Sequence, residues 1–561
     1  MKKIFSILIL IAMVFMMTSC ERNIGEIELP YYNEEGEADY NPELFYRNDL
    51  KQSGADPTII YVTEGEYAGY FFVYPTYGGC TNYSCYKSKD CHSWEFVSIA
   101  FEPDDMSWSK ASLWAPSVIY DPTCELGKYI LFYCARNDLE KNGPTGVKYI
   151  GMAYSDSPAG PFIQYTGTNS NGQVIDIDNP LINMGKYFDH NSPEYREKGM
   201  PFIDPCAFID PVTNEKYLYV CRSRSGGEKA NEIYVFHMFD WATPDYESYT
   251  KVARINKTKV LDGEQTELFE GEIDEAPDML YHDGLYYLTM SINATTDKNY
   301  SVIQAISTSP MGPFEKIQAS KGGLVLGSEV DWDHLATCGS HDFVEVNGEI
   351  YCIYHQSMGR AGGNMDRAFA MDKIEFVKNE DGLTLLKAVG PTYSIQPKPE
   401  VFTGYKNIAP LATITATNAE NSVELLHDKL VRFHDVEVFD EFIANDTTTI
   451  TLKFDKYYKA KALLIYNSYD YFLSFYHIKS IKFSFVKEEA DETVKGKAVI
   501  KDVYYDFDKY ADIQNEMMRP GAPMVFEFEE LLVNSVEIVI EMPADQERMA
   551  ISEIMLLGKE E

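Results

Sequence analysis

Apolar and polar residues alternate through five similar stretches in the first four hundred residues of the chain. Each stretch starts near a Pro or Asp, runs through an alternating apolar segment, passes a turn with Gly, Asn or Asp, and enters a second aromatic segment. Alternation with a period of two on both sides of a turn predicts a β-hairpin. The predicted hairpins span residues 55–75, 114–134, 203–221, 275–290 and 341–355.

The intervals between these hairpins have room for two further strands each. Strand-like patterns occur at 87–101, 151–165 and 303–317, and the last two segments share the turn S-P-x-G-P-F. No helical period interrupts the series. Four strands repeated five times predict an all-β fold, a five-bladed β-propeller over residues 45–400, in which the first strand of each blade faces a central channel.

The residues that open the hairpins are expected to meet at one mouth of this channel. Three of the five are carboxylates, and acids of random loops need not fall at the same phase of a repeat. The mouth is therefore a candidate chemical site. Asp278 and Asp283, in the same acidic stretch as Glu275, are expected to be ordinary strand and turn residues. The predicted mouth residues are Asp56, Ala115, Asp204, Glu275 and His341.

The pattern changes after the Pro-rich stretch at 396–410, which is typical of a linker. The following segments are rich in strands but lack the hairpin repeat, and they predict a β-sandwich of the jelly-roll type over residues 401–561. The NIAP sequence at 407–410 and ISEIMLLG at 551–558 resemble a galactose-binding-like, discoidin-type domain. This resemblance implies a ligand in loops at one end of the sandwich, and a packing role is the alternative.

The N-terminus has the pattern of an export signal. Lys2 and Lys3 precede a short apolar run and small residues before Cys20, which predicts a signal peptide over residues 1–19. The run is too short for a comfortable membrane span. With a cysteine at the expected mature N-terminus, the segment resembles a bacterial lipoprotein signal, which implies a lipidated Cys20 and a tether over 20–44. An ordinary cleaved signal with a free Cys20 is the alternative.

The amino-acid composition argues against some classes of ligand. Asp and Glu number 87 against 49 Lys and Arg, and the formal charge of −38 argues against nucleic acid or anionic lipid as a ligand. A neutral glycan is compatible with this surface and with 41 tyrosines. Nine cysteines follow Cys20 without zinc-site spacing. Pairs could form across hairpins, but buried reduced thiols are expected. The candidate pairs are Cys124 with Cys134 and Cys206 with Cys221.

Six short motifs, in order, resemble glycoside hydrolase family 43 and its five-bladed relatives over roughly residues 45–400. They are ADP at 55–57, WAP at 114–116, IDP at 203–205, EAP at 275–277, SHDF at 340–343 and YH at 354–355.

The resemblance implies the roles of three carboxyl groups. Asp56 would be the general base, Glu275 the general acid, and Asp204 the residue that orients the acid and adjusts its pKa. Inverting hydrolysis needs one acid and one base about 6.5–9.5 Å apart, and a neighbouring carboxylate would keep the acid protonated. The nucleophile motif of the retaining, fructan-cleaving relatives is missing, which argues against a covalent route.

Other site residues follow from the same resemblance. Arg367 is expected to bind substrate, with Arg360 as the alternative. His341 is expected near the channel axis, where it would contact substrate or help to hold a metal ion or water; a buried histidine with satisfied hydrogen bonds is the alternative. Trp114 could stack on a sugar ring or pack in the core. The chemistry needs no cofactor, and a structural calcium ion at the propeller axis is compatible with the family.

These observations predict an exported, lipid-anchored inverting glycosidase that acts on arabinofuranosides or xylosides. Its location would be the outer membrane, at the periplasmic or cell-surface face. A propeller that binds glycan without cleaving it is one alternative, although all three carboxyl groups are present. A transferase, phosphorylase or retaining hydrolase on a related propeller is another.

Overall fold

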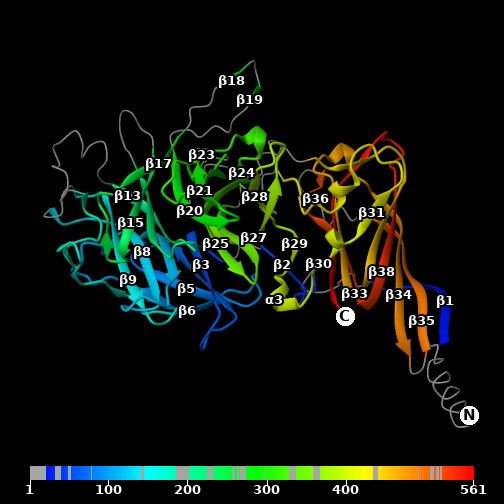
Figure 1. Ribbon diagram of the computed structural model, residues 1–561, viewed down its shortest axis with the longest axis horizontal. Helices are drawn as coiled ribbons and strands as arrows, with labels where there is room; N and C mark the ends of the chain where they lie inside the picture. Colours follow the sequence, from blue (N-terminus) through cyan, green and yellow to red (C-terminus); the bar gives the residue numbers. More distant parts are fainter. Residues whose placement is uncertain are drawn as a thin grey trace, which may run out of the picture. The chain divides into compact units, whose positions relative to one another are not determined.

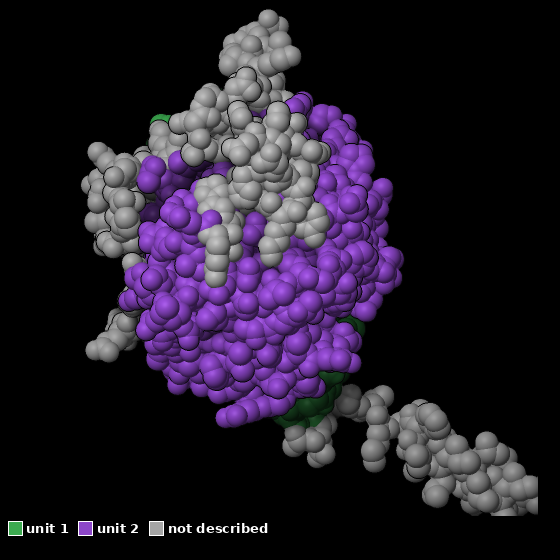
Figure 2. All heavy atoms as spheres, turned by 90° about the vertical axis from the view of Figure 1, so that its left-hand side faces the viewer, with its two compact units in different colours: residues 1–44, 403–432, 440–561 green, residues 45–402, 433–439 purple. Residues whose placement is uncertain are grey.

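A computed structural model describes most of the chain and divides it into two compact units, shown as space-filling surfaces in Figure 2. Unit 1 comprises Met1–Leu44, Thr403–Arg432 and Asp440–Glu561, and unit 2 comprises Phe45–Phe402 and Phe433–Phe439. The described residues are 20–31, 40–48, 52–77, 79–140, 145–184, 201–223, 231–255, 260–261, 264–265, 273–296, 299–327, 336–357, 367–433, 440–489, 492–505, 511–512, 517–518 and 521–561.

Unit 2 contains five antiparallel sheets of four or five strands each, besides short two-stranded pairs, and these five confirm the five predicted blades (Figure 1). Blade 1 holds β3 (Ala55–Val62), β4 (Tyr70–Thr76), β5 (Tyr83–Ser88) and β6 (Glu95–Phe101). Blade 2 holds β7 (Trp114–Tyr120), β8 (Tyr129–Arg136), β9 (Lys148–Ser155) and β10 (Ile163–Gln164). Blade 3 holds β13 (Phe202–Ile209), β14 (Lys216–Arg222), β15 (Glu232–Asp240), β16 (Thr243–Pro244) and β17 (Thr250–Arg254).

The last two blades follow the same plan. Blade 4 holds β20 (Asp274–His282), β21 (Leu285–Ile292), β22 (Ser301–Ser307), β23 (Glu315–Lys316) and β24 (Leu324–Leu326). Blade 5 holds β25 (Ala336–Val346), β26 (Glu349–Ser357), β27 (Arg367–Lys378) and β28 (Thr384–Ala388). A short pair, β2 (Phe45–Arg47) with β29 (Ile395–Pro397), joins the two ends of the unit.

The second strand of each blade is an almost continuous apolar run because it is buried on both faces. In β8 every residue from Tyr129 to Ala135 is buried, and in β21 so is every residue after Leu285. Large side chains such as Tyr133 and Tyr287 are fully buried, and each contributes about 1.5–3 kcal/mol. The nine cysteines from Cys80 to Cys352 are free thiols, most of them buried.

A β-bulge interrupts every innermost strand near its start. The pairing register shifts between Ala55 and Thr58 in β3, and at matching places in the other four blades. One residue of each bulge has a positive φ between 41° and 50°, a region that costs a non-Gly residue about 1–2 kcal/mol. These residues are Asp56, Ala115, Asp204, Ala276 and Ser340.

This register corrects the predicted mouth positions in two blades. Glu275 precedes the bulge residue Ala276 and is one place earlier in the repeat than Asp56 and Asp204. His341 follows the bulge residue Ser340 and is one place later. Only two carboxylates therefore share the bulge phase, and Glu275 reaches the mouth from the adjacent position.

The D-P and A-P motifs have a physical reason in this geometry. In four blades a proline follows the bulge residue. Proline has no N–H to donate. It fits here because the register shift leaves its position without a hydrogen-bonded partner on the second strand of the blade. The N–H of the bulge residue bonds to the preceding blade instead. Asp56 N donates to His355 Nδ1 at 3.2 Å and Ala115 N to Thr76 Oγ1 at 2.8 Å.

The main sheet of unit 1 is a nine-stranded hydrogen-bonded network, compatible with the predicted sandwich (Figure 1), and the short pair β36 (Ala511–Asp512) with β37 (Met517–Met518) is separate from it. Its strands are β1 (Cys20–Glu28), β30 (Lys406–Asn407), β31 (Thr413–Ala416), β32 (Phe442–Ala444), β33 (Thr448–Asn467), β34 (His477–Glu489), β35 (Glu492–Tyr504), β38 (Pro523–Glu541) and β39 (Met549–Glu560). Register shifts in β33, between Lys453 and Tyr458 and at Ala460, interrupt its long pairings with β38 and β39.

Residues 20–44 do not form a free tether throughout. Strand β1 pairs in parallel with β35, from Cys20 opposite Glu492 to Glu28 opposite Val499. The predicted signal peptide lies outside the described residues. Within the described part of the chain, no helix is long and apolar enough to cross a membrane.

Candidate active site at the mouth of the channel

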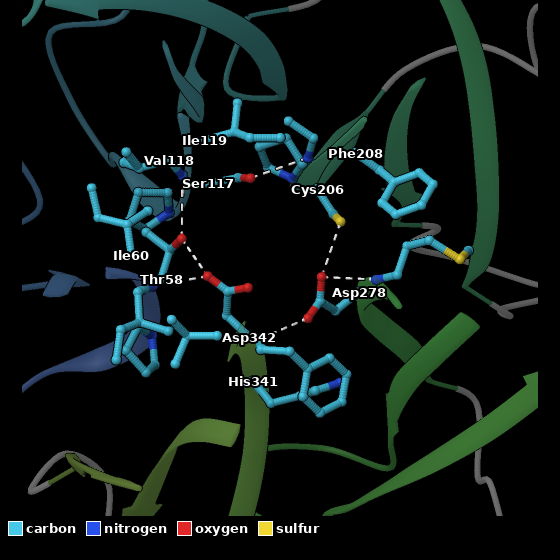
Figure 3. Close-up of a pocket in the computed structure, with 18 of the residues that line it drawn as sticks. Thr58, Ile60, Ser117, Val118, Ile119, Cys206, Phe208, Asp278, His341 and Asp342 are labelled. Carbon is cyan, nitrogen blue, oxygen red and sulfur yellow. Dashed lines mark hydrogen bonds between the residues drawn. The ribbon is translucent and has the colours of Figure 1, made fainter. Parts of the chain in front are cut away.

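An axial cavity of about 660 Å³ runs between the innermost strands of unit 2. All five innermost strands line it, from the bulge residues at one end to Tyr61, Tyr120 and Glu345 at the other. Figure 3 shows its middle part, where side chains form hydrogen bonds between neighbouring blades. The cavity therefore has two regions, a mouth at the bulges and a middle two residues further along each strand.

Asp56 lies at the mouth as an ionised carboxylate. Its Oδ1 is 3.3 Å from Arg367 Nη1 and 3.3 Å from His355 Nδ1, and the side chain is 15% exposed. Burial acts to raise the pKa of Asp56, but the hydrogen bond to His355 and the charge of Arg367 outweigh it and hold this pKa well below its usual range. The geometry thus brings Arg367, the first residue of β27, to the carboxylate predicted as the base. Arg360 lies outside the described residues.

Asp204 and Glu275 have the opposite electrostatic character. Burial, followed by the charge of Asp56, raises the pKa of Asp204 to about 7. Burial and the charges of Asp204 and Asp56 raise the pKa of Glu275 well above its usual value. Asp204 Oδ2 accepts a hydrogen bond of 3.0 Å from Ala276 N, next to Glu275 in the chain. This bond ties Asp204 to the backbone that carries Glu275.

Two aromatic rings connect the acid side of the mouth with the base side. Tyr300 donates from its hydroxyl to Glu275 Oε1 at 3.2 Å. The Tyr300 ring stacks on His355 with centroids 5.6 Å apart and an interplanar angle of 12°. Burial lowers the pKa of His355, so its imidazole is neutral near pH 7. When His355 Nδ1 carries no proton, it accepts a hydrogen bond from the backbone N–H of Asp56. In the other tautomer Nδ1 carries the proton and donates to the Asp56 carboxylate.

Trp114 lies beside the mouth with its side chain 42% exposed, so it is not a core aromatic. It precedes the bulge residue of blade 2, as Glu275 does in blade 4. The indole is therefore carried at the same phase of the repeat as the predicted acid.

His341 lines the channel but is held away from the bulge position. Its Nε2 is 2.6 Å from Thr289 Oγ1, its ring packs edge-on against Phe343, and Nδ1 is buried without a hydrogen-bond partner among the described residues. Burial lowers the pKa of His341 to about 3. Calcium prefers six to eight oxygen ligands, and the described residues bring no three His, Cys, Asp or Glu side chains together as a metal group. This donor set does not fit a calcium ion held by His341.

The middle of the channel carries a ring of side chains that sequence reasoning missed. Each lies two residues after a bulge. Four of them accept a hydrogen bond from the backbone N–H of the next blade, for example Asp342 Oδ2 from Ile59 N at 2.8 Å and Asp278 Oδ2 from Phe343 N at 3.0 Å. The fifth, Cys206, donates from Sγ to Asp278 Oδ1 at 3.2 Å. The ring members are Thr58, Ser117, Cys206, Asp278 and Asp342.

The sequence context predicted that Asp278 is an ordinary strand residue. This prediction is wrong, because Asp278 belongs to the ring of hydrogen-bonded side chains. It is 7% exposed, and its carboxyl group lies beside that of Asp342 of the neighbouring blade in Figure 3. Burial and then the charge of Asp342 raise the pKa of Asp278 well above its usual value, and burial raises the pKa of Asp342 to about 6. Asp283 lies in the β20–β21 turn with φ 47° and an exposed side chain, as predicted.

The geometry defines a class of protein: a five-bladed propeller whose mouth holds one carboxyl group of lowered pKa, Asp56, and two of raised pKa, Asp204 and Glu275. The sequence matches the model of glycosyl hydrolases family 43 over residues 46–183 and 177–383. Because this match covers more than half of the chain, the protein belongs to that family and is a glycoside hydrolase. Enzymes of the family need no cofactor for catalysis.

Curated relatives are distant. The extracellular endo-α-(1→5)-L-arabinanase of Thermotoga petrophila is 26% identical over 291 residues, 49% of this chain and 53% of the relative. The chain thus spans about half the length of that protein. Xylosidase/arabinosidase 43A of Humicola insolens is 23% identical over 50% of this chain and 77% of its own length. A solved structure of a thermostable family-43 glycoside hydrolase aligns with a TM-score of 0.48 and 23% identity, over 63% of this chain and 99% of that one.

Proposed function

We propose that the protein is an exported glycosidase that cleaves arabinofuranosides or xylosides with inversion, using Glu275 as general acid and Asp56 as general base. The opposite protonation states of these two groups at one mouth carry the proposal. The pKa of Asp56 is lowered and that of Glu275 is raised well above its usual value, which are the directions that a base and an acid of inverting hydrolysis require.

In this mechanism the carboxylate of Asp56 takes a proton from the attacking water while Glu275 gives its proton to the leaving oxygen. Arg367 and His355 fix the Asp56 carboxylate, and Tyr300 fixes Glu275 Oε1. Asp204 supplies negative charge beside Glu275 and keeps it protonated until the bond breaks. General acid and base catalysis each contribute typically 10²–10⁴-fold.

The substrate class follows from the relatives rather than from the mouth. The named activities of the Thermotoga and Humicola proteins concern arabinan, arabinosides and xylosides. The pentose units of these substrates are uncharged, which agrees with a chain of formal charge −38. A panel of substrates must therefore decide between the two sugars.

The proposal includes export and anchoring through Cys20. The N-terminal pattern supports a lipoprotein signal, and the location would be the outer membrane. Expression with its own leader should give a membrane-bound protein whose Cys20→Ser variant is released by the same fractionation. Equal release of both proteins would refute the lipid anchor without affecting the enzyme assignment.

A metal ion has no step in this mechanism, because the donor set around His341 does not fit calcium. Dialysis of the protein against EDTA should leave its rate of hydrolysis within about twofold. A loss of activity that added Ca²⁺ restores would show that a channel ion is required.

The experiment that tests the function is hydrolysis of aryl α-L-arabinofuranosides, β-D-xylosides and galactosides by the purified protein. Glu275→Gln and Asp56→Asn are measured in parallel, and Asp283→Asn serves as the control because it changes an exposed carboxylate of the same stretch. We expect release from one sugar, lost in the first two variants and kept in the control. Activity equal in all four proteins would contradict the site. Saturable glycan binding without turnover of any substrate would favour the non-catalytic alternative.

A further inference from the structure

Lys148, the first residue of β9, is a buried lysine beside the mouth. It is only 9% exposed, and lysine is almost never fully buried without a partner. Its ammonium forms no ion pair with a described carboxylate. Instead Nζ donates to the carbonyl of Ser112 and lies 3.3 Å from the centroid of the Trp114 ring. A desolvated cation over an indole is a favourable contact, so this charge has two described partners, the Ser112 carbonyl and the Trp114 indole.

The main chain of Trp114 is fixed independently of its ring. Its carbonyl accepts hydrogen bonds from the Tyr83 hydroxyl at 2.9 Å and from Cys134 Sγ at 3.3 Å. Ala115 N, the next donor along the chain, bonds to Thr76 Oγ1. The indole itself remains 42% exposed. The hydrogen bonds therefore fix the backbone of Trp114, and the ring has its own contact with Lys148.

The position of this pair links it to the reacting groups. Trp114 occupies in blade 2 the place before the bulge that Glu275 occupies in blade 4. Lys148 also acts on the blade 3 carboxyl, since its positive charge lowers the pKa of Asp204 against the effects of burial and of Asp56. Arg367, which is paired with Asp56, lowers the pKa of Asp204 as well, so Lys148 is one of two cations that act on this carboxyl group.

We propose that Lys148 is a positioning residue for substrate: its ammonium holds the Trp114 indole as a stacking surface for one sugar unit beside Asp204. This inference rests on the proposed function and adds to it a residue that binds sugar only through another side chain. Aromatic rings bind the apolar C–H face of a pyranose or furanose, and a ring held from one side presents its other side without loss of order.

Lys148→Met tests the proposal, because it keeps the length of the side chain and removes the charge. We expect KM for the hydrolysed glycoside to rise on the order of tenfold while kcat changes less than threefold. Lys148→Arg keeps a cation over the ring and should restore KM, which separates a folding defect from a lost contact. Lys89→Met is the matched control, since Lys89 Nζ lies 4.2 Å from the Tyr70 ring centroid.

A double-mutant cycle with Trp114→Leu shows whether Lys148 acts through the indole. In the Trp114→Leu background, Lys148→Met should change KM less than twofold. The acidic limb of the kcat/KM profile should move to higher pH in Lys148→Met, because the pKa of Asp204 loses a lowering charge. A KM penalty of equal size in both backgrounds, or a KM in Lys148→Met equal to that of the Lys89→Met control, would overturn the proposal.

A binding measurement separates this inference from the proposed function. L-arabinose and D-xylose are titrated against the protein, and quenching of tryptophan fluorescence is followed. If no glycoside is hydrolysed, the proposed function fails, yet quenching that is lost in Trp114→Leu and weakened in Lys148→Met still supports the stacking surface. Equal quenching in these variants and the wild type would refute it.

Discussion

The mouth and the middle of the channel each hold buried carboxyl groups, but among the described residues only the mouth pairs one of them with a cation. Asp56 faces the Arg367 guanidinium and the neutral imidazole of His355. The pKa of Asp56 is lowered while that of Glu275 is raised. In the middle, Asp278 and Asp342 accept hydrogen bonds from backbone N–H groups of neighbouring blades, and burial raises both pKa values. In the proposed mechanism carboxyl groups thus transfer protons at the mouth, whereas in the middle of the channel they form hydrogen bonds between neighbouring blades.

The largest of these effects is expected on activity, from a substitution of Asp204 at the mouth. Asp204→Asn should lower kcat/KM on the order of 10²-fold, because Glu275 loses the adjacent charge that raises its pKa. The alkaline limb of the pH–rate profile should move to lower pH, which a kinetic titration will show. An unchanged alkaline limb would mean that Asp204 does not control the protonation of Glu275.

Removal of the middle group should affect stability. Asp278→Ala leaves the N–H groups of Phe343 and Met279 without their acceptor, and each buried unsatisfied donor costs about 1–3 kcal/mol. We expect a loss of about 2–4 kcal/mol in the unfolding free energy of unit 2, measured by denaturant titration. Asp283→Ala at the exposed turn is the control. Equal stability of both variants would show that the ring of hydrogen bonds does not hold the blades.

A smaller effect is expected in the pH dependence of stability. The folded pKa of Asp342, about 6, lies above its ordinary value of 3.8, so the folded state binds more protons between these values. Stability should therefore fall as pH rises from about 4 to 6. Asp342→Asn can still accept at one oxygen and should be more stable than wild type above pH 7 by about 1–3 kcal/mol. The measurement is thermal unfolding across pH, and a variant less stable than wild type above pH 7 would contradict it.

Sequence patterns predicted the blades because alternation and turn residues are local. They did not predict the phase of Glu275 and His341, since the bulge depends on a backbone angle and the S-H-D segment lacks the proline that marks the other four. The five ring members lie at the same position of the repeat. Because the blades place Thr, Ser, Cys or Asp there, no single residue type marks this position in the sequence.

Other features depend on contacts between segments that are distant in the chain. Lys148 reaches Trp114 from the third strand of the blade, and no periodicity marks it. His355 lies in the quoted YH motif, yet its partner Asp56 is 299 residues away. Strand β1 joins β35, more than 470 residues along, so a segment of ordinary polar composition could not be distinguished from a tether.

The most direct test of the central claim is the dependence of the two site variants on the leaving group. Rates are measured on a dinitrophenyl glycoside, whose leaving group needs no proton, and on an unactivated oligosaccharide of the same sugar. The account predicts that Glu275→Gln keeps most activity on the first and loses it on the second, whereas Asp56→Asn loses both. Equal losses of Glu275→Gln on the two substrates would contradict the assignment of Glu275 as the acid.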